Sequence, residues 1–257
     1  MKDIQSLRDH RRINIKKVGV KDISYPISVL DRANQVQRTV ARVNMYVNLP
    51  HQFKGTHMSR FIEILNHFHG DINLRSFQLI LEETKAKLQA EAAHMEIEFP
   101  FFLKKKSLTT NKVELAEYLC KMHGSLDQND DLTLEVAVPI SPPAPVQTHS
   151  GLPESLGHWG VANICLRFKH FIWLEELIEM VEDVTSHDLR WSVSSVKPLD
   201  YTLSVERIAK DLAEKLASHP DINWCSITVE NLSQGFSTFA TIEWPEEDLN
   251  CNRNCIH

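Results

Sequence analysis

Residues 41–49 and the segment that follows them, 53–62, form the stretch of sequence that decides the fold. The first segment, Ala41-Arg42-Val43-Asn44-Met45-Tyr46-Val47-Asn48-Leu49, places apolar side chains at every second position, which is typical of a strand with one buried face. The second, Phe53-Lys54-Gly55-Thr56-His57-Met58-Ser59-Arg60-Phe61-Ile62, gathers a Lys, a His and an Arg around a Gly at the expected start of a helix. Because the N–H groups that begin a helix have no partner within it and favour anions, this segment indicates an anionic ligand.

The same two periodicities recur along the whole chain. We expect strands at residues 41–49, 95–101, 132–140, 161–168, 225–229 and 236–244, and helices at 57–68, 75–92, 173–185 and 205–216. We assign to the first half the order strand, strand, helix, helix, strand, strand, and the second half repeats this order from about Asp131. The pattern predicts an α+β fold of two ββααββ units, each an antiparallel sheet with a helix pair on one face. The expected boundaries are 1–130, 131–250 and a tail at 251–257.

Composition limits the classes of function. The 257 residues are 42% hydrophobic and 24% charged, which is typical of a soluble globular protein. The net charge of −6 argues against a nucleic-acid-binding protein, which would carry a basic excess. No apolar run is long enough to cross a membrane, and the N-terminus has no signal-peptide pattern, so we expect a cytoplasmic protein. The five scattered cysteines indicate reduced thiols rather than disulfides.

Three motifs carry a resemblance to a known family. Val18-Gly19-Val20-Lys21, Tyr25-Pro26-Ile27 and Lys54-Gly55-Thr56-His57-Met58-Ser59-Arg60-Phe61 resemble the type IB GTP cyclohydrolases. The resemblance implies the tunnelling fold and the hydrolytic opening of the guanine ring of GTP to 7,8-dihydroneopterin triphosphate and formate, a step of pterin and folate biosynthesis. It also implies a divalent metal, zinc or manganese, and a homotetramer with sites for GTP or a pterin at subunit interfaces.

The resemblance assigns roles to residues of the second half. Gly157-His158 matches the family's Gly/Ala-His motif, which makes His158 a metal ligand and a catalytic residue. Glu206 matches the Glu that anchors the base, and Asp200 occupies the position of a family metal-site Glu. In the first half, His57 and Arg60 are expected to bind substrate or to lie at an interface.

Other positions depart from the family pattern. Ala144-Pro145-Val146 replaces the family's Cys-Pro-Cys run, and the segment 230–238 lacks the family's C-terminal histidines. His149, in the loop that follows the Pro-rich segment 139–145, is a candidate substitute metal ligand beside His158 and Asp200. Three readings remain open: a GTP cyclohydrolase, a non-catalytic purine- or pterin-binding paralogue or partner subunit, and an enzyme for another pterin or purine. The run Lys104-Lys105-Lys106 has two readings, a solvated charge run or a contact to triphosphate.

Overall fold

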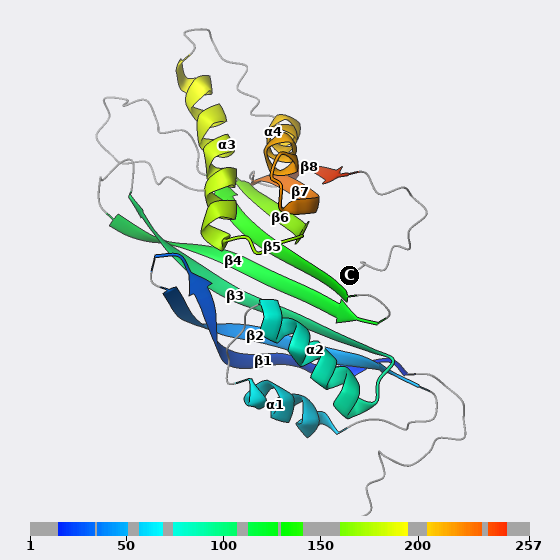
Figure 1. The fold of residues 1–257 in the computed structure, drawn as a ribbon. Coiled ribbons are helices and arrows are strands. Elements are labelled where there is room, and N and C mark those ends of the chain that lie inside the picture. Colours follow the sequence, from blue (N-terminus) through cyan, green and yellow to red (C-terminus); the bar gives the residue numbers. More distant parts are fainter. Residues whose placement is uncertain are drawn as a thin grey trace, which may run out of the picture. The chain divides into compact units, whose positions relative to one another are not determined.

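The computed structural model describes residues 15–33, 35–50, 57–68, 74–106, 113–127, 130–140, 160–194, 205–232 and 236–245. The elements are β1 Ile15–Asp31, β2 Gln35–Leu49, α1 Met58–His67, α2 Leu74–Leu88, β3 Ala92–Lys106, β4 Val113–Leu126, β5 Asp130–Ile140, β6 Gly160–Phe168, α3 Leu174–Ser194, α4 Val205–Ala217, β7 Ile222–Leu232 and β8 Ser237–Trp244 (Figure 1). The order ββααββ occurs twice, so the duplicated arrangement expected from the sequence is confirmed.

The eight strands pair in chain order, from β1 to β8, in one sheet. The pairs β1–β2, β2–β3, β6–β7 and β7–β8 are antiparallel. By their contacts the residues group into two units. Unit 1 comprises residues 1–101 and 119–134, and unit 2 comprises residues 102–118 and 135–257. Strands β3, β4 and β5 thus contribute residues to both units.

Unit 1 buries the apolar face predicted by the alternation in β2. Val43, Met45 and Val47 are fully buried, and α1 and α2 lie over this face of the strands (Figure 1). The helices contribute the large side chains Phe61 and Phe77 to the same core. Because successive strand residues point to opposite faces, the intervening residues of β2 form a second face that carries no described helix of this unit. We call this surface the helix-free face.

Unit 2 is built in the same way around α3 and α4 (Figure 1). The buried side of its strands carries Ile164, Ile227 and Val229, among others. Helix α4 buries one stripe against β7 and β8: Val205, Ile208, Ala209, Leu212 and Leu216. This stripe has the spacing that predicted the helix, so the local pattern and the packing agree.

Two helix ends differ from the sequence expectation. Helix α2 ends at Leu88 instead of 92, because Gln89 adopts a left-handed conformation with φ 51°. The Gln89 N–H donates to the carbonyl of Ala86 at 3.2 Å, and the Ala90 N–H donates to that of Lys85 at 3.0 Å, which is the Schellman pattern. Helix α3 continues to Ser194, beyond the expected end at 185, since the apolar stripe that predicted it stops at Val184.

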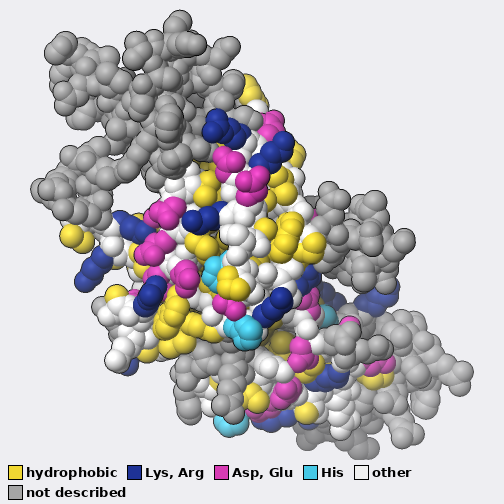
Figure 2. All heavy atoms as spheres, turned by 45° about the horizontal axis from the view of Figure 1, so that its top comes forward, with side chains coloured by type: hydrophobic (Ala, Val, Ile, Leu, Met, Phe, Trp, Pro, Cys, Tyr) yellow, Lys and Arg dark blue, Asp and Glu magenta, His cyan; other side chains and the backbone are white. Residues whose placement is uncertain are grey.

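The described surface mixes charges of both signs. In Figure 2, acidic and basic side chains are interspersed on the face that is drawn, with apolar side chains between them. No described helix is long and apolar enough to span a membrane.

The described cysteines, Cys120, Cys165 and Cys225, form no disulfides with one another. Burial raises the pKa of the Cys120 thiol to about 12, which favours the protonated form.

Candidate functional site

The residues expected to form the metal site lie outside the described part of the chain. This holds for His149, His158 and Asp200, and equally for the Ala144-Pro145-Val146 run. Among the described residues, no group of three or more His, Cys, Asp or Glu side chains is arranged to hold a metal ion. The structure therefore describes three of the six candidate site residues: Glu206, His57 and Arg60.

Glu206 lies in the first turn of α4 in unit 2. Its neighbour Val205 is buried in the core, whereas the Glu206 side chain is exposed on the flank of the helix. The adjacent Arg207 pairs with Asp211 along the helix at 3.7 Å. An acidic residue in the first turn of a helix is stabilised by the helix dipole. An exposed carboxylate at this position can accept two parallel N–H bonds from a planar ligand.

His57 and Arg60 lie at the start of α1 in unit 1. His57 is the N-cap residue, with extended backbone angles (φ −74°, ψ 118°), and its carbonyl accepts a hydrogen bond of 3.1 Å from the Arg60 N–H. The first turn contains no acidic residue, so nothing there repels an anion. Arg60 is exposed, and its Nη1 donates to the carbonyl oxygen of Lys87 on α2 at 3.4 Å. The helix start predicted at this basic segment is confirmed.

Lys105 forms an ion pair within unit 2. Its Nζ atom lies 2.6 Å from Oε2 of Glu182 on α3, and the hydroxyl of Tyr118 donates to the other carboxylate oxygen. Burial, followed by the bond to Glu182, raises the pKa of Tyr118 well above its ordinary value. Lys105 is thus ion-paired with Glu182, whereas the side chain of the adjacent Lys104 is exposed.

A group of polar side chains on the helix-free face of unit 1 was not anticipated from the sequence. It comprises Lys17, Asn44, Tyr46, His94, Glu96, Lys121 and His123, and we call it the polar cluster. The His94 ring stacks on that of Tyr46, and the Lys17 Nζ lies 3.6 Å from the centre of the Tyr46 ring. Glu96 accepts hydrogen bonds from Asn44 at 3.0 Å and from Tyr46 at 3.4 Å. The sequence distributes these polar residues over several strands. Only the pairing of the strands brings their side chains together.

The environment of the polar cluster favours uncharged histidines. Burial lowers the pKa of His94, and the charges of His123 and Lys17 lower it further. Burial also lowers the pKa of His123, although the carboxylates of Glu96 and Asp131 act in the opposite direction. Burial alone would raise the pKa of Glu96, but the Asn44 hydrogen bond and the nearby positive charges bring it below its ordinary value. The cluster thus contains its own counter-ion, Glu96.

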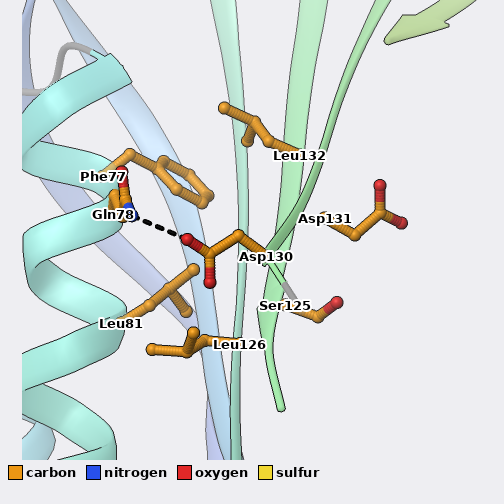
Figure 3. A pocket seen from close by; sticks show the side chains of 8 residues that line it. All are labelled: Phe77, Gln78, Leu81, Ser125, Leu126, Asp130, Asp131 and Leu132. Carbon is orange, nitrogen blue, oxygen red and sulfur yellow. Dashed lines mark hydrogen bonds between the residues drawn. The ribbon is translucent and has the colours of Figure 1, made fainter. Parts of the chain in front are cut away.

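Unit 1 also contains a hollow between α2 and the hairpin of β4 and β5. Its volume is about 340 Å³, and its floor is mostly apolar, with Phe77, Leu81, Leu126 and Leu132. In Figure 3, Gln78 points toward Asp130 and donates a hydrogen bond of 2.7 Å to it, while Asp131 and Ser125 point away from α2. None of the candidate site residues lines this hollow, so we assign it no part in the predicted chemistry.

Comparison with known proteins identifies the family. The family model described as Type I GTP cyclohydrolase folE2 matches residues 1–233. A GTP cyclohydrolase FolE2 of Syntrophobacter fumaroxidans is 44% identical over 255 residues, which cover 95% of this chain and 99% of that protein. A GTP cyclohydrolase FolE2 of Geobacter sulfurreducens is 42% identical, with 95% and 98% covered. The chain belongs to the type I GTP cyclohydrolase FolE2 family.

Solved structures agree with the fold of this FolE2 family member. A hyper-thermostable AgUricase mutant superposes with a TM-score of 0.54 over 91% of this chain and 94% of that chain, at 8% identity. The urate oxidase of Bacillus subtilis gives a TM-score of 0.50, with 88% and 97% covered, at 10% identity. At such identities the likeness concerns the fold alone. It confirms the tunnelling-fold arrangement that the resemblance implied.

Proposed function

We propose that this chain is a hydrolase that opens the guanine ring of GTP to give 7,8-dihydroneopterin triphosphate and formate. The observation that carries the proposal is the match to the family over residues 1–233, together with relatives named GTP cyclohydrolase FolE2 that align along 95% of the chain. The alignments cover 99% and 98% of the lengths of two of these relatives.

In this proposal Glu206 holds the guanine base. A carboxylate can accept from the ring N1–H and the 2-amino group together, and such charge-assisted bonds are strong. The exposure of Glu206 in the first turn of α4 supports the assignment, because a ligand can reach the side chain without displacing the core. Orientation of the ring by two bonds would fix C8 in position for attack by water.

His149, His158 and Asp200 are the proposed metal ligands. Two imidazoles and one carboxylate are donor types that fit zinc or manganese. These residues would hold a divalent ion, which would lower the pKa of the attacking water. His158 has a second proposed role, which is to move a proton to or from the reacting ring atoms.

The start of α1 is the proposed site for the triphosphate. His57 and Arg60 lie at the start of α1, and the first turn has no carboxylate to oppose the ligand. Backbone donors and cationic side chains together favour phosphate.

We further propose a cytoplasmic homo-oligomer, a tetramer, with sites completed between subunits. Strands β1 and β8 stand at the ends of the described strand order and are open for pairing.

A second candidate function is a non-catalytic protein that binds a purine or pterin through Glu206. The replacement of the family's thiolates by Ala144 and Val146 favours it, because neither side chain can ligate a metal. Base binding through Glu206 needs no metal, so it can persist where catalysis is lost.

The test of the first proposal compares Glu206→Ala with Glu214→Ala, a matched exposed residue near the other end of α4. Loss of two charge-assisted bonds should lower kcat/KM for GTP by roughly 100-fold. Glu214→Ala should match wild type. If Glu206→Ala retains wild-type kcat/KM, the base-anchoring role is wrong. If wild type binds GTP but releases no formate, the second candidate replaces the first.

A further inference from the structure

The hollow between α2 and the β4–β5 hairpin has the dimensions of a small-molecule site. Its volume of about 340 Å³ is at the lower end of the usual range for such sites, roughly 300–1,000 Å³. All of its lining residues belong to unit 1, and none of them has a role in the proposed GTP chemistry. The hollow is therefore formed within this unit, and its size suits a compact ligand.

Two contacts between α2 and the hairpin hold the walls of the hollow in place. Gln78 on α2 donates a hydrogen bond of 2.7 Å to the carboxylate of Asp130 (Figure 3). Further along the same helix, the Nζ atom of Lys85 donates to the carbonyl oxygen of Asp127. Lys85 is thus held at the hairpin and does not line the hollow. Because the walls are fixed before a ligand binds, little ordering is needed on binding.

The floor of the hollow is apolar. Phe77 is 1% exposed and Leu81 4%, whereas Leu126 and Leu132 on the hairpin are half-buried. Gly124 on β4 carries no side chain, and a Cβ atom there would lie 2.3 Å from Cε1 of Phe77, so the ring packs directly on the strand. This floor offers contact area to the hydrocarbon part of a ligand and no hydrogen bond.

The mouth of the hollow is negatively charged. Gln78 and Asp130 are exposed, and the described residues that line the hollow include Asp130 and Asp131 but no Lys, Arg or His. Asp131 points away from α2 in Figure 3, which leaves Asp130 facing the helix. Within the described part of the chain, Asp130 has no ion-pair partner, and its hydrogen-bond partner is the neutral Gln78. A carboxylate beside an apolar floor is complementary to an ammonium group attached to hydrocarbon.

We propose that this hollow is a binding site for a small amine with an apolar body. The hydrocarbon part lies against Phe77 and Leu81, and the ammonium group donates a charge-assisted hydrogen bond to Asp130. An anion of the same shape is repelled by Asp130, and an uncharged analogue loses the charge-assisted bond. The proposal does not depend on the GTP chemistry proposed above.

A titration of the complete protein by fluorine NMR tests the proposal. The probe is para-fluorophenethylamine, and the matched probes with the same ring are para-fluorophenethyl alcohol and para-fluorophenylacetate. Wild type should bind the amine roughly 10-fold more tightly than either matched probe, because only the amine forms a hydrogen bond in which both groups are charged. Asp130→Asn should weaken amine binding roughly 10-fold and leave binding of the alcohol unchanged.

Two further variants locate the binding. Asp183→Asn, at an exposed position of α3 in unit 2, is the matched control and should bind the amine like wild type. Leu132→Trp places a large ring in the hollow and should abolish binding of both the amine and the alcohol. Circular dichroism checks the fold of each variant. If Leu132→Trp unfolds, Asp130→Asn still decides the question, because its position is exposed and the amide can keep the contact to Gln78.

Several outcomes would overturn the assignment. They are no binding of the amine to wild type, equal binding of the amine and the phenylacetate, wild-type amine affinity in Asp130→Asn or in folded Leu132→Trp, and an equal loss in Asp183→Asn. GTP turnover is measured separately. An active enzyme that does not bind the amine removes this inference alone, and an inactive protein that binds the amine through Asp130 removes the proposed function alone.

Discussion

The imidazole ring of His94 on β3 stacks on the phenol ring of Tyr46 on β2, with ring centres 4.7 Å apart and planes inclined by 15°. The Lys17 ammonium group also lies against the Tyr46 ring, 3.6 Å from its centre. A charged His94 would therefore bring a second cation close to Lys17. This arrangement links three neighbouring strands and makes the polar cluster sensitive to protonation.

The first prediction concerns stability and pH. The pKa values of His94 and His123 lie below the ordinary 6.5 in the folded protein, so the unfolded chain binds protons more readily. The stabilisation is complete above pH 6.5 and is lost as the pH falls toward the folded values. The unfolding temperature should thus decrease between about pH 7 and pH 5, and His94→Gln with His123→Gln should make that decrease shallower. Parallel curves for wild type and the double variant would contradict the prediction.

The second prediction concerns the Lys105–Glu182–Tyr118 contact in unit 2. Glu182→Ala leaves the buried Tyr118 hydroxyl without its acceptor and Lys105 without its counter-ion. We expect a loss of about 1–3 kcal/mol in the free energy of unfolding, measured by urea denaturation. Glu179→Ala, at an exposed position of the same helix, is the control and should change little. A loss for Glu182→Ala no larger than for the control would show that the contact contributes nothing.

The third prediction concerns Gly19, within one of the motifs shared with the family. A Cβ atom at Gly19 would lie 1.9 Å from the carbonyl oxygen of Met45 and 2.5 Å from the Cα of Tyr46. Backbone atoms cannot rotate away, so Gly19→Ala must displace β1 from β2 and should cost about 1–3 kcal/mol in thermal or urea unfolding. Ser24→Ala, at an exposed position of β1, is the control. Equal stability of the two variants would contradict the packing argument.

Six of the eight described strands and the four described helices followed from local patterns, because alternation and helical spacing indicate which face is buried. Strands β1 and β4 were not among the ranges expected from alternation. The end of α2 could not be predicted in this way, since Gln89 occupies the left-handed position where glycine is the usual signal. The polar cluster could not be predicted from the sequence either. His94 and Glu96 are two residues apart on β3, but Lys17 and His123 reach them only through strand pairing across the sheet.

The candidate site followed from motif resemblance and not from periodicity. Glu206 and the His57–Arg60 segment could be placed at helix starts, because caps and stripes locate such starts in a sequence. The roles of His149, His158 and Asp200 remain predictions. All three residues lie outside the part of the chain that the structure describes.

The fourth prediction concerns metal content. Protein purified with zinc or manganese should hold the ion in stoichiometric amount, and His158→Ala should lose it, since removing one of three ligands lowers affinity steeply. Elemental analysis after dialysis measures this directly. His170→Ala is a suitable control, because His170 pairs with Asp221 at 2.8 Å and is no proposed ligand. Full metal content in His158→Ala would remove that residue from the site.

The most direct test of the central claim is the incubation of the wild-type protein with GTP and manganese or zinc, followed by oxidation and measurement of neopterin fluorescence. The account predicts fluorescence that grows with time and enzyme concentration, together with release of formate. Unchanged GTP in the presence of either metal, with the protein folded and GTP bound, would contradict the proposed cyclohydrolase activity.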